Sequence, residues 1–315
     1  MLLLSRPSTL ATNISTLDQE HQNRVCWTTY CLDRMTSSEL GLLPVFQSDH
    51  VGINYPSNDN LSAEEAAEFY DPQFLRLRAQ ITLIRSDIAA DIYNTGKVDF
   101  ADIEARVAPS LSKLKTWMTD LPPHMSFDCE SGIPEAMAQM PTMRCLASTY
   151  LRFNHLFLKH IAYILSNETS TSLPQHLKNL SNTCLGAART NLRILTDLWH
   201  YERIAKFGFW DSLHLFSSLT IVFMAMSVNI RRPGSFDEKE TDAITYTTAK
   251  AVLQDMVQAG SLAAKGHEKM LKEVEAMGQS FYVAPPAGFD LMPEQWDVDG
   301  WMAQILDPGN ILNSL

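Results

Sequence analysis

Residues 20–56 read EHQNRVCWTTYCLDRMTSSELGLLPVFQSDHVGINYP, and the first half of this stretch decides the fold. It combines aromatic side chains, an adjacent acidic and basic residue, and a glycine that closes the segment. The residues concerned are Arg24, Trp27, Tyr30, Asp33, Arg34 and Gly41. Their spacing fits no catalytic motif. An architectural helix is the first interpretation, and direct contact with an effector is the alternative.

The same stretch predicts a helix over residues 17–40. Thr16 and Gln19 have the spacing of a capping box before it, and Gly41 suits the left-handed residue that ends many helices. Asp33 and Arg34 are sequence neighbours, which do not face each other on a helix, so we expect each to pair with another part of the chain. Two adjacent sides of this helix carry large side chains, namely Val25, Thr28 or Thr29, Leu32 and Met35 on one and Trp27, Tyr30, Cys31 and Arg34 on the other.

Helical periodicity also dominates the rest of the chain. Asp71 and Pro72 form an N-cap and first-turn pair, from which apolar residues recur at steps of three and four until Gly96. A second pattern runs from Ile103 to Met118 and ends just before two prolines. Further helices are predicted at about 135–167, 174–199, 208–230, 236–259 and 261–278. No run with the period of a strand is long enough for a sheet, so the predicted fold class is all-α, a multi-helix array.

The composition changes from about residue 279 to an acidic, proline-containing, aromatic and partly irregular tail. This divides the chain into a helical array, residues 1–278, and a tail, residues 279–315. Acidic–hydrophobic alternation is typical of activation segments, which order an aromatic face against a coactivator groove. The candidate docking residues are Phe289, Leu291, Trp296, Trp301, Ile305 and Leu306. The alternative is a solubilising tail that folds back onto the helices, with Trp296 and Trp301 filling a groove.

Charge and cysteine content exclude several classes of function. The net charge is −11, and seven acidic residues with no Lys or Arg follow Lys272, so a nucleic-acid-binding face is not expected in this chain. The five cysteines are scattered, with no pair at the spacing of a zinc site, which favours reduced thiols in an intracellular protein. Neither a metal site nor a disulfide framework is predicted.

An enzyme and a membrane protein are the alternatives to a helical regulatory domain. Glycine-rich nucleotide loops, a serine-nucleophile elbow and a zinc-protease helix are all absent from the sequence. Asn58, Asp59 and Ser62 begin a magnesium motif of terpene cyclases, but Ala66 replaces its final glutamate. His155 and His160 have an awkward spacing for one metal ion. We therefore expect no enzyme. Residues 212–230 are uncharged, which raises the possibility of a membrane span, but polar residues such as His214, Ser217 and Asn229 dilute their apolar character and favour a buried core helix.

The opening segment closely resembles the regulatory domain, or middle homology domain, of fungal binuclear zinc-cluster transcription factors. Shorter resemblances follow in the family's order. They are Trp117 with the Leu-Pro-Pro-His segment at 121–124, the helix from Tyr150 to His160, the Cys-Leu-Gly-Ala-Ala-Arg segment at 184–189, the apolar helix after Phe209–Trp210, and Gly260 with Ala263 and Ala264. Departures include Asn23 and Cys26 where the family pairs Arg and Trp, and Leu42 where Arg usually follows the glycine.

The resemblance implies a nuclear regulator of RNA polymerase II transcription that responds to an effector or partner through the transcriptional machinery or coactivator proteins. DNA binding and zinc would belong to the family's N-terminal module of six cysteines, which is absent from this sequence along with its dimerising coiled coil. A truncated gene model, a fragment and a natural regulator without that module all stay open. A small-molecule effector and a homodimer are also left open. The rival interpretations are a small-molecule-sensing helical domain without DNA binding and a membrane-associated helical protein.

Overall fold

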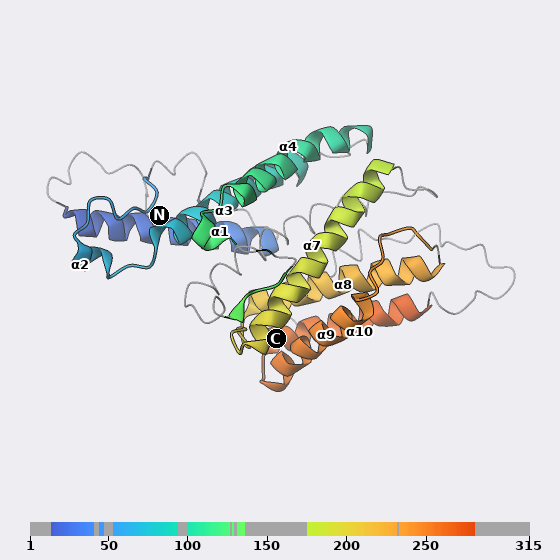
Figure 1. Ribbon diagram of the computed structural model, residues 1–315. Coiled ribbons are helices and arrows are strands. Elements are labelled where there is room, and N and C mark those ends of the chain that lie inside the picture. The colour runs from blue at the N-terminus through green and yellow to red at the C-terminus, as the bar shows by residue number, and fades with distance from the viewer. Residues whose placement is uncertain are drawn as a thin grey trace, which may run out of the picture. The chain divides into compact units, whose positions relative to one another are not determined.

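A computed structural model describes residues 14–40, 44–46, 53–93, 100–126, 128, 131–135, 175–231 and 233–280. All regular elements in these ranges are helical, which confirms the predicted all-α class. The elements are α1 (Thr16–Leu40), α2 (Ala63–Ala66), α3 (Pro72–Tyr93), α4 (Phe100–Thr119), the short 3-10 helix η2 (Pro123–Met125), α7 (Gln175–His200), α8 (Phe209–Arg231), α9 (Asp242–Gln258) and α10 (Leu262–Ser280). They fall into two compact units, residues 1–122 and 123–315 (Figure 1).

Most predicted helices appear within a few residues of their expected bounds. Helix α9 is the exception, because it begins at Asp242 instead of about residue 236. The intervening residues form a turn that is bonded to neighbouring helices, since Asn229 exchanges two hydrogen bonds with the Phe236 backbone and Asn182 accepts one from the Asp237 N–H. Helix α2 and η2 lie in stretches for which no helix was predicted. Apart from Glu135, the helix expected at 135–167 lies outside the described residues, as do Gly41 and residues 281–315.

Helix starts follow from local side-chain caps. The Ser15 hydroxyl accepts a hydrogen bond from the Asp18 N–H at 3.0 Å, so α1 is capped one residue before the predicted Thr16–Gln19 pair. Asp71 caps α3 as predicted, because its carboxylate accepts from the Gln73 N–H at 2.9 Å. These caps satisfy backbone N–H groups that have no partner inside a helix.

The first unit is built on α3, which packs against α1 on one side and α4 on another. Trp27, Tyr30 and Cys31 of α1 are buried together with Ala79 of α3. The small alanine side chain lets the indole and phenol rings approach the α3 backbone. This cluster buries two of the largest side chains of α1 and so stabilises the unit.

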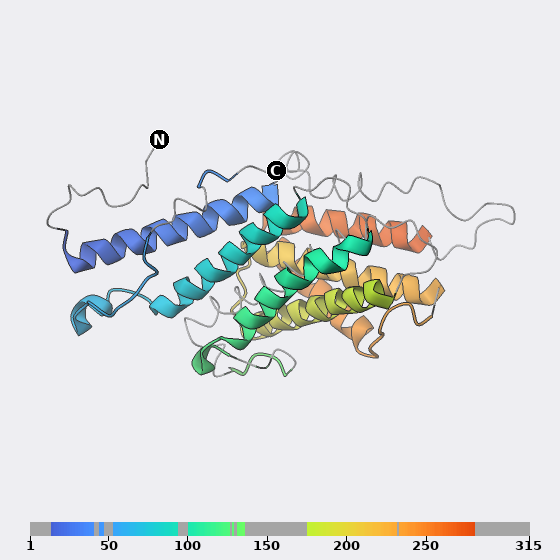
Figure 2. The same ribbon diagram turned by 90° about the horizontal axis from the view of Figure 1, so that it is seen from above.

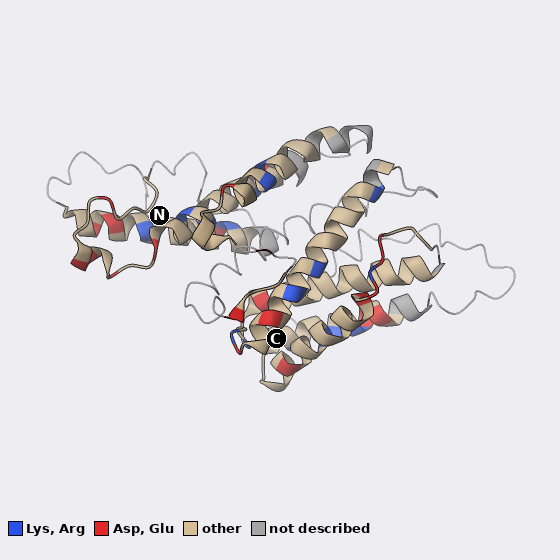
Figure 3. Ribbon diagram, viewed as in Figure 1, with Lys and Arg blue, Asp and Glu red and all other residues tan. Residues whose placement is uncertain are grey.

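The second unit is a bundle of α7, α8, α9 and α10 in which α8 contacts each of the other three (Figure 2). Helix α8 carries no charged residue between Asp211 and Arg231, as the uniform tan of its ribbon shows in Figure 3. Leu215, Leu219 and Val222 are fully buried. The span Phe209–Ile230 is long and apolar enough to cross a membrane, but most of it is buried within the protein, as in the core helix of a bundle.

The turn between α9 and α10 depends on one glycine. Gly260 has φ +98°, its N–H donates to the Val257 carbonyl, and the following Ser261 N–H donates to the Met256 carbonyl. This is the Schellman pattern, in which the left-handed residue is usually glycine because a Cβ atom is strained there. The turn reverses the chain so that α10 returns along α8 and α9.

Candidate functional site

The signature residues of α1 meet in one structural feature, which we call the loop clamp: Arg24, Trp27, Asp33 and Arg34 hold residues 45–46 and 54–70 against the helix. Asp33 accepts hydrogen bonds from the backbone N–H groups of Val45 and Phe46, both at 3.1 Å. Arg34 donates to the Phe46 carbonyl at 2.5 Å. As expected for sequence neighbours on a helix, the two charged residues do not pair with each other. Asp33 binds backbone N–H groups and Arg34 binds a backbone carbonyl of the same short segment, Val45–Phe46.

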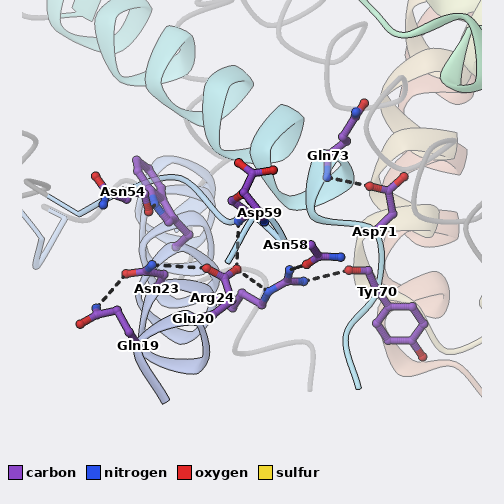
Figure 4. A network of polar contacts seen from close by, with 12 residues as sticks. Gln19, Glu20, Asn23, Arg24, Asn54, Asn58, Asp59, Tyr70, Asp71 and Gln73 are labelled. Atoms are coloured by element: carbon purple, nitrogen blue, oxygen red, sulfur yellow. Dashed lines mark hydrogen bonds and ion pairs between the residues drawn. The ribbon is translucent and has the colours of Figure 1, made fainter. Parts of the chain in front are cut away.

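Arg24 is the centre of the other half of the loop clamp (Figure 4). Its guanidinium donates to the Glu20 carboxylate at 2.7 Å, to the Asn58 side-chain oxygen at 2.7 Å and to the Tyr70 carbonyl at 2.8 Å. The same group lies over the Phe69 ring, with 4.2 Å between the guanidinium carbon and the ring centroid. A planar donor with five N–H groups can hold several acceptors at once, which a lysine at this position could not reproduce.

Glu20 extends this network and was not among the residues predicted from the sequence. Its side chain is buried, and its carboxylate accepts from the Ser57 N–H at 3.1 Å as well as from Arg24. Asn23 also donates to it at 3.4 Å (Figure 4). The sequence did contain a signal, because Glu20 and Arg24 have the i, i+4 spacing of a helical ion pair. Only the structure shows that this pair faces a loop.

The aromatic residues of the signature close the middle of the loop clamp. The Trp27 indole N–H donates to the Asn54 carbonyl at 3.0 Å, and the indole is stacked on Tyr55 with 4.8 Å between ring centroids. The Tyr30 ring packs edge to face against the Trp27 ring, with 5.7 Å between ring centroids. Burial raises the pKa of the Tyr55 phenol, and the nearby positive charge of Arg76 partly offsets this effect.

Several other predicted residues have local structural contacts. Asn58 binds Arg24, and Ser62 caps α2 in a capping box with Glu65. Two residues of the incomplete magnesium motif therefore have structural contacts. His155, His160 and Gly41 lie outside the described residues. The tail residues Phe289, Leu291, Trp296, Trp301, Ile305 and Leu306 also lie outside them.

The first unit also contains a cleft of about 660 Å³ between α3 and α4. Tyr55, which stacks on Trp27, and Trp117 of α4 are among the residues that line it. Trp117 is held in place by a hydrogen bond from its indole N–H to the Leu77 carbonyl of α3 at 3.2 Å. Trp117 was predicted only through the family resemblance, and the sequence pattern contains no indication of a cleft.

In the second unit, the Cys-Leu-Gly-Ala-Ala-Arg segment of α7 packs into the bundle. Cys184 and Ala188 are buried, and burial raises the pKa of the Cys184 thiol to about 12, which leaves it protonated and unreactive at neutral pH. Arg189 forms a bidentate ion pair with Asp242 of α9, with N–O distances of 2.7 and 2.5 Å. These contacts link helices. Within the described ranges, no group of three or more His, Cys, Asp or Glu side chains could hold a metal ion.

Comparison with known protein families gives one finding. Residues 3–97 match the sequence model of the family described as "Fungal specific transcription factor domain". The matched stretch contains α1, the loop clamp and α3, so the predicted family resemblance is confirmed there. The later resemblances, from Trp117 onward, lie beyond it. Comparison with curated proteins finds no match, and neither does comparison with solved structures.

Proposed function

We propose that this chain is the responsive part of a zinc-cluster-type regulator of RNA polymerase II transcription, because residues 3–97 match the fungal specific transcription factor domain, which is a domain of nuclear transcription regulators. The observation that carries the proposal is the match itself, which spans the whole loop clamp. The charged groups of the clamp are engaged with backbone or neighbouring side chains, which supports a role in holding a regulatory domain together.

The mechanism that we propose is a regulated interaction without chemistry. The helical array masks or presents the acidic tail, residues 279–315, and an effector or partner shifts the balance between these two states. The aromatic residues of the tail supply the binding energy for a coactivator or another part of the transcriptional machinery. Neither a cofactor nor a metal ion in this chain is needed for such a role.

DNA binding belongs, in this proposal, to a separate zinc-cluster module. The net charge of −11 gives the chain no electrostatic attraction to a phosphate backbone. Figure 3 shows Lys and Arg residues interspersed with Asp and Glu along the described helices. Contacts of this chain are therefore expected to be with proteins or small molecules.

The test is a reporter assay with the chain fused to a heterologous DNA-binding domain. Deleting residues 285–315 should lower reporter output, because the aromatic docking residues are lost. Trp296→Ala combined with Trp301→Ala should have the same effect, and Asn310→Ala combined with Asn313→Ala serves as the matched control. Immunoblots must show equal amounts of each fusion. Unchanged output after the deletion removes the activation role.

A further inference from the structure

The cleft between α3 and α4 has the dimensions of a small-molecule site. Its volume of about 660 Å³ lies within the range of about 300–1,000 Å³ that is usual for such sites. All of its lining residues belong to the first unit. The cleft therefore exists within one compact body of the protein.

One part of the lining is apolar and held rigidly. Leu77 and Ile84 of α3, Trp117 of α4 and Tyr55 line the cleft. Trp117 is fixed by its bond to the Leu77 carbonyl, and Tyr55 is fixed by its stack on Trp27. Two aromatic rings with fixed positions suit a ligand that carries a large apolar or aromatic body.

Among the described residues, the charged part of the lining contains one cation and one anion for which no oppositely charged partner is found. Lys113 is bound by Asp87 at 2.6 Å. In contrast, Arg76 lies over the Tyr55 ring at 5.4 Å, and no carboxylate within the described ranges lies at ion-pair distance from it. Asp120 likewise has no ion pair among those residues. A bound group that brings the opposite charge would pair each of them.

These two charges lie toward the same end of the cleft. Helices α3 and α4 run antiparallel. Trp117, which comes later in α4, bonds to Leu77 near the start of α3, whereas Lys113, which comes earlier in α4, bonds to Asp87 farther along α3. Asp120 lies three residues beyond Trp117 in the direction of Arg76. The cleft therefore combines a guanidinium, a carboxylate and an aromatic wall within reach of one small molecule.

We propose that this cleft binds a zwitterionic small molecule, namely an amino acid with a large apolar side chain. The ligand carboxylate pairs with Arg76, its ammonium group pairs with Asp120, and its side chain packs between Tyr55 and Trp117. This binding would supply the effector of the proposed function. Only the transcriptional consequence depends on that function, and the binding itself does not.

Calorimetric titration of the full chain tests the ligand class. The probes are L-tryptophan, indole-3-propionate, which lacks the ammonium group, and tryptamine, which lacks the carboxylate. L-Tryptophan should bind at least about tenfold more tightly than either analogue, because each loses a charge-assisted contact. Equal affinity for the three probes, or no saturable binding of L-tryptophan at millimolar concentration, overturns the proposal.

Variants of the two charged residues test the position of the site. Arg76→Gln should abolish the preference for L-tryptophan over tryptamine, and Asp120→Asn should abolish its preference over indole-3-propionate. Lys115→Gln is the matched control, because Lys115 is an exposed α4 cation outside the cleft lining and its loss should leave all affinities unchanged. Circular dichroism must show equal folding. Wild-type affinities in both cleft variants contradict the assignment.

The failures of the two proposals can be told apart. Binding that follows the predicted pattern, in a chain whose reporter output is insensitive to tail deletion, keeps the ligand site and removes the activation role. Reporter output that depends on the tail, without any binding of L-tryptophan, removes the ligand site and keeps the activation role.

Discussion

Trp27 and Tyr30 lie almost one turn apart on α1 and are both buried, yet their polar atoms differ in hydrogen bonding. The Trp27 indole N–H donates to the Asn54 carbonyl. The Tyr30 hydroxyl is buried without a hydrogen-bond partner among the described residues. The ring of Tyr30 therefore contributes through its area and its contact with Trp27, while Trp27 also fixes the loop.

This difference predicts opposite outcomes for two similar substitutions. Tyr30→Phe should leave the free energy of unfolding within about 0.5 kcal/mol of wild type or raise it, since no hydrogen bond is lost. Trp27→Phe should lower it by about 1–3 kcal/mol, because the Asn54 carbonyl loses its donor and a gap forms beside Tyr55. Urea unfolding measures both, and hydrogen exchange of α1 peptides localises the effect. A large loss in Tyr30→Phe would show that the hydroxyl has a partner.

His267 gives the second unit a predicted pH dependence. Its ring is buried beside the Ser212 hydroxyl at 3.0 Å and stacked on Phe216, and burial lowers its pKa to about 4. In the unfolded chain the pKa of a histidine is about 6.5. Between these values the unfolded state binds the proton and the folded state does not, so stability falls as the pH falls through this window.

We expect the free energy of unfolding to fall by about 2 kcal/mol between pH 7 and pH 5 because of His267, as measured by urea unfolding at both pH values. His267→Gln should remove that part of the slope, because glutamine does not titrate. His21→Gln is the control, since His21 is half exposed beside Glu68, and this variant should follow wild type. A His267→Gln protein with an unchanged slope contradicts the assignment.

At the level of elements, the pair Arg189–Asp242 joins α7 to the start of α9. Both side chains are more than nine-tenths buried. Arg189 also donates to the Asp237 carbonyl at 2.7 Å, and Asp242 accepts from the Lys239 N–H at 3.0 Å. The pair thus fixes the turn before α9 as well as the helix. This arrangement accounts for the late start of α9.

Removing one member of this pair should be strongly destabilising. Asp242→Asn leaves the buried guanidinium without its counter-charge, and we expect a loss of about 3–5 kcal/mol in the free energy of unfolding. Lys272→Gln, which breaks the more exposed pair with Glu268, should change it by less than about 0.5 kcal/mol. Thermal and urea unfolding compare the two. Similar small effects in both variants would show that the α7–α9 link contributes little.

At the scale of the whole molecule, the chain forms two compact units. The first, residues 1–122, contains the stretch that matches the family, the loop clamp and the cleft. The second, residues 123–315, contains the α7–α10 bundle and the covalent connection to the acidic tail. The predicted boundary between the helical array and the tail, between residues 278 and 279, was based on composition. The division at residues 122 and 123 follows from contacts within each unit and coincides with the Pro122–Pro123 pair.

How much could be predicted depended on whether a feature was local. Helix positions followed from periodicity, and the Asp71 cap followed from the two residues that form it. The burial of α1 could not be predicted in the same way, because two of its sides carried large side chains. Val25 and Leu32 prove to be exposed, whereas Trp27, Tyr30 and Cys31 are buried against Ala79.

The sequence by itself determined the all-α class, the helix order and the resemblance of the N-terminal stretch to a known domain family, because these depend on spacing within short segments. Only the tertiary structure decided what the signature residues contact. Asp33 and Arg34 bind backbone groups twelve or thirteen residues away, and Arg24 binds Asn58 and Tyr70, which are 34 and 46 residues away. Such partners are set by how the chain returns on itself, and backbone acceptors carry no side-chain signal. The cleft between α3 and α4 arises for the same reason.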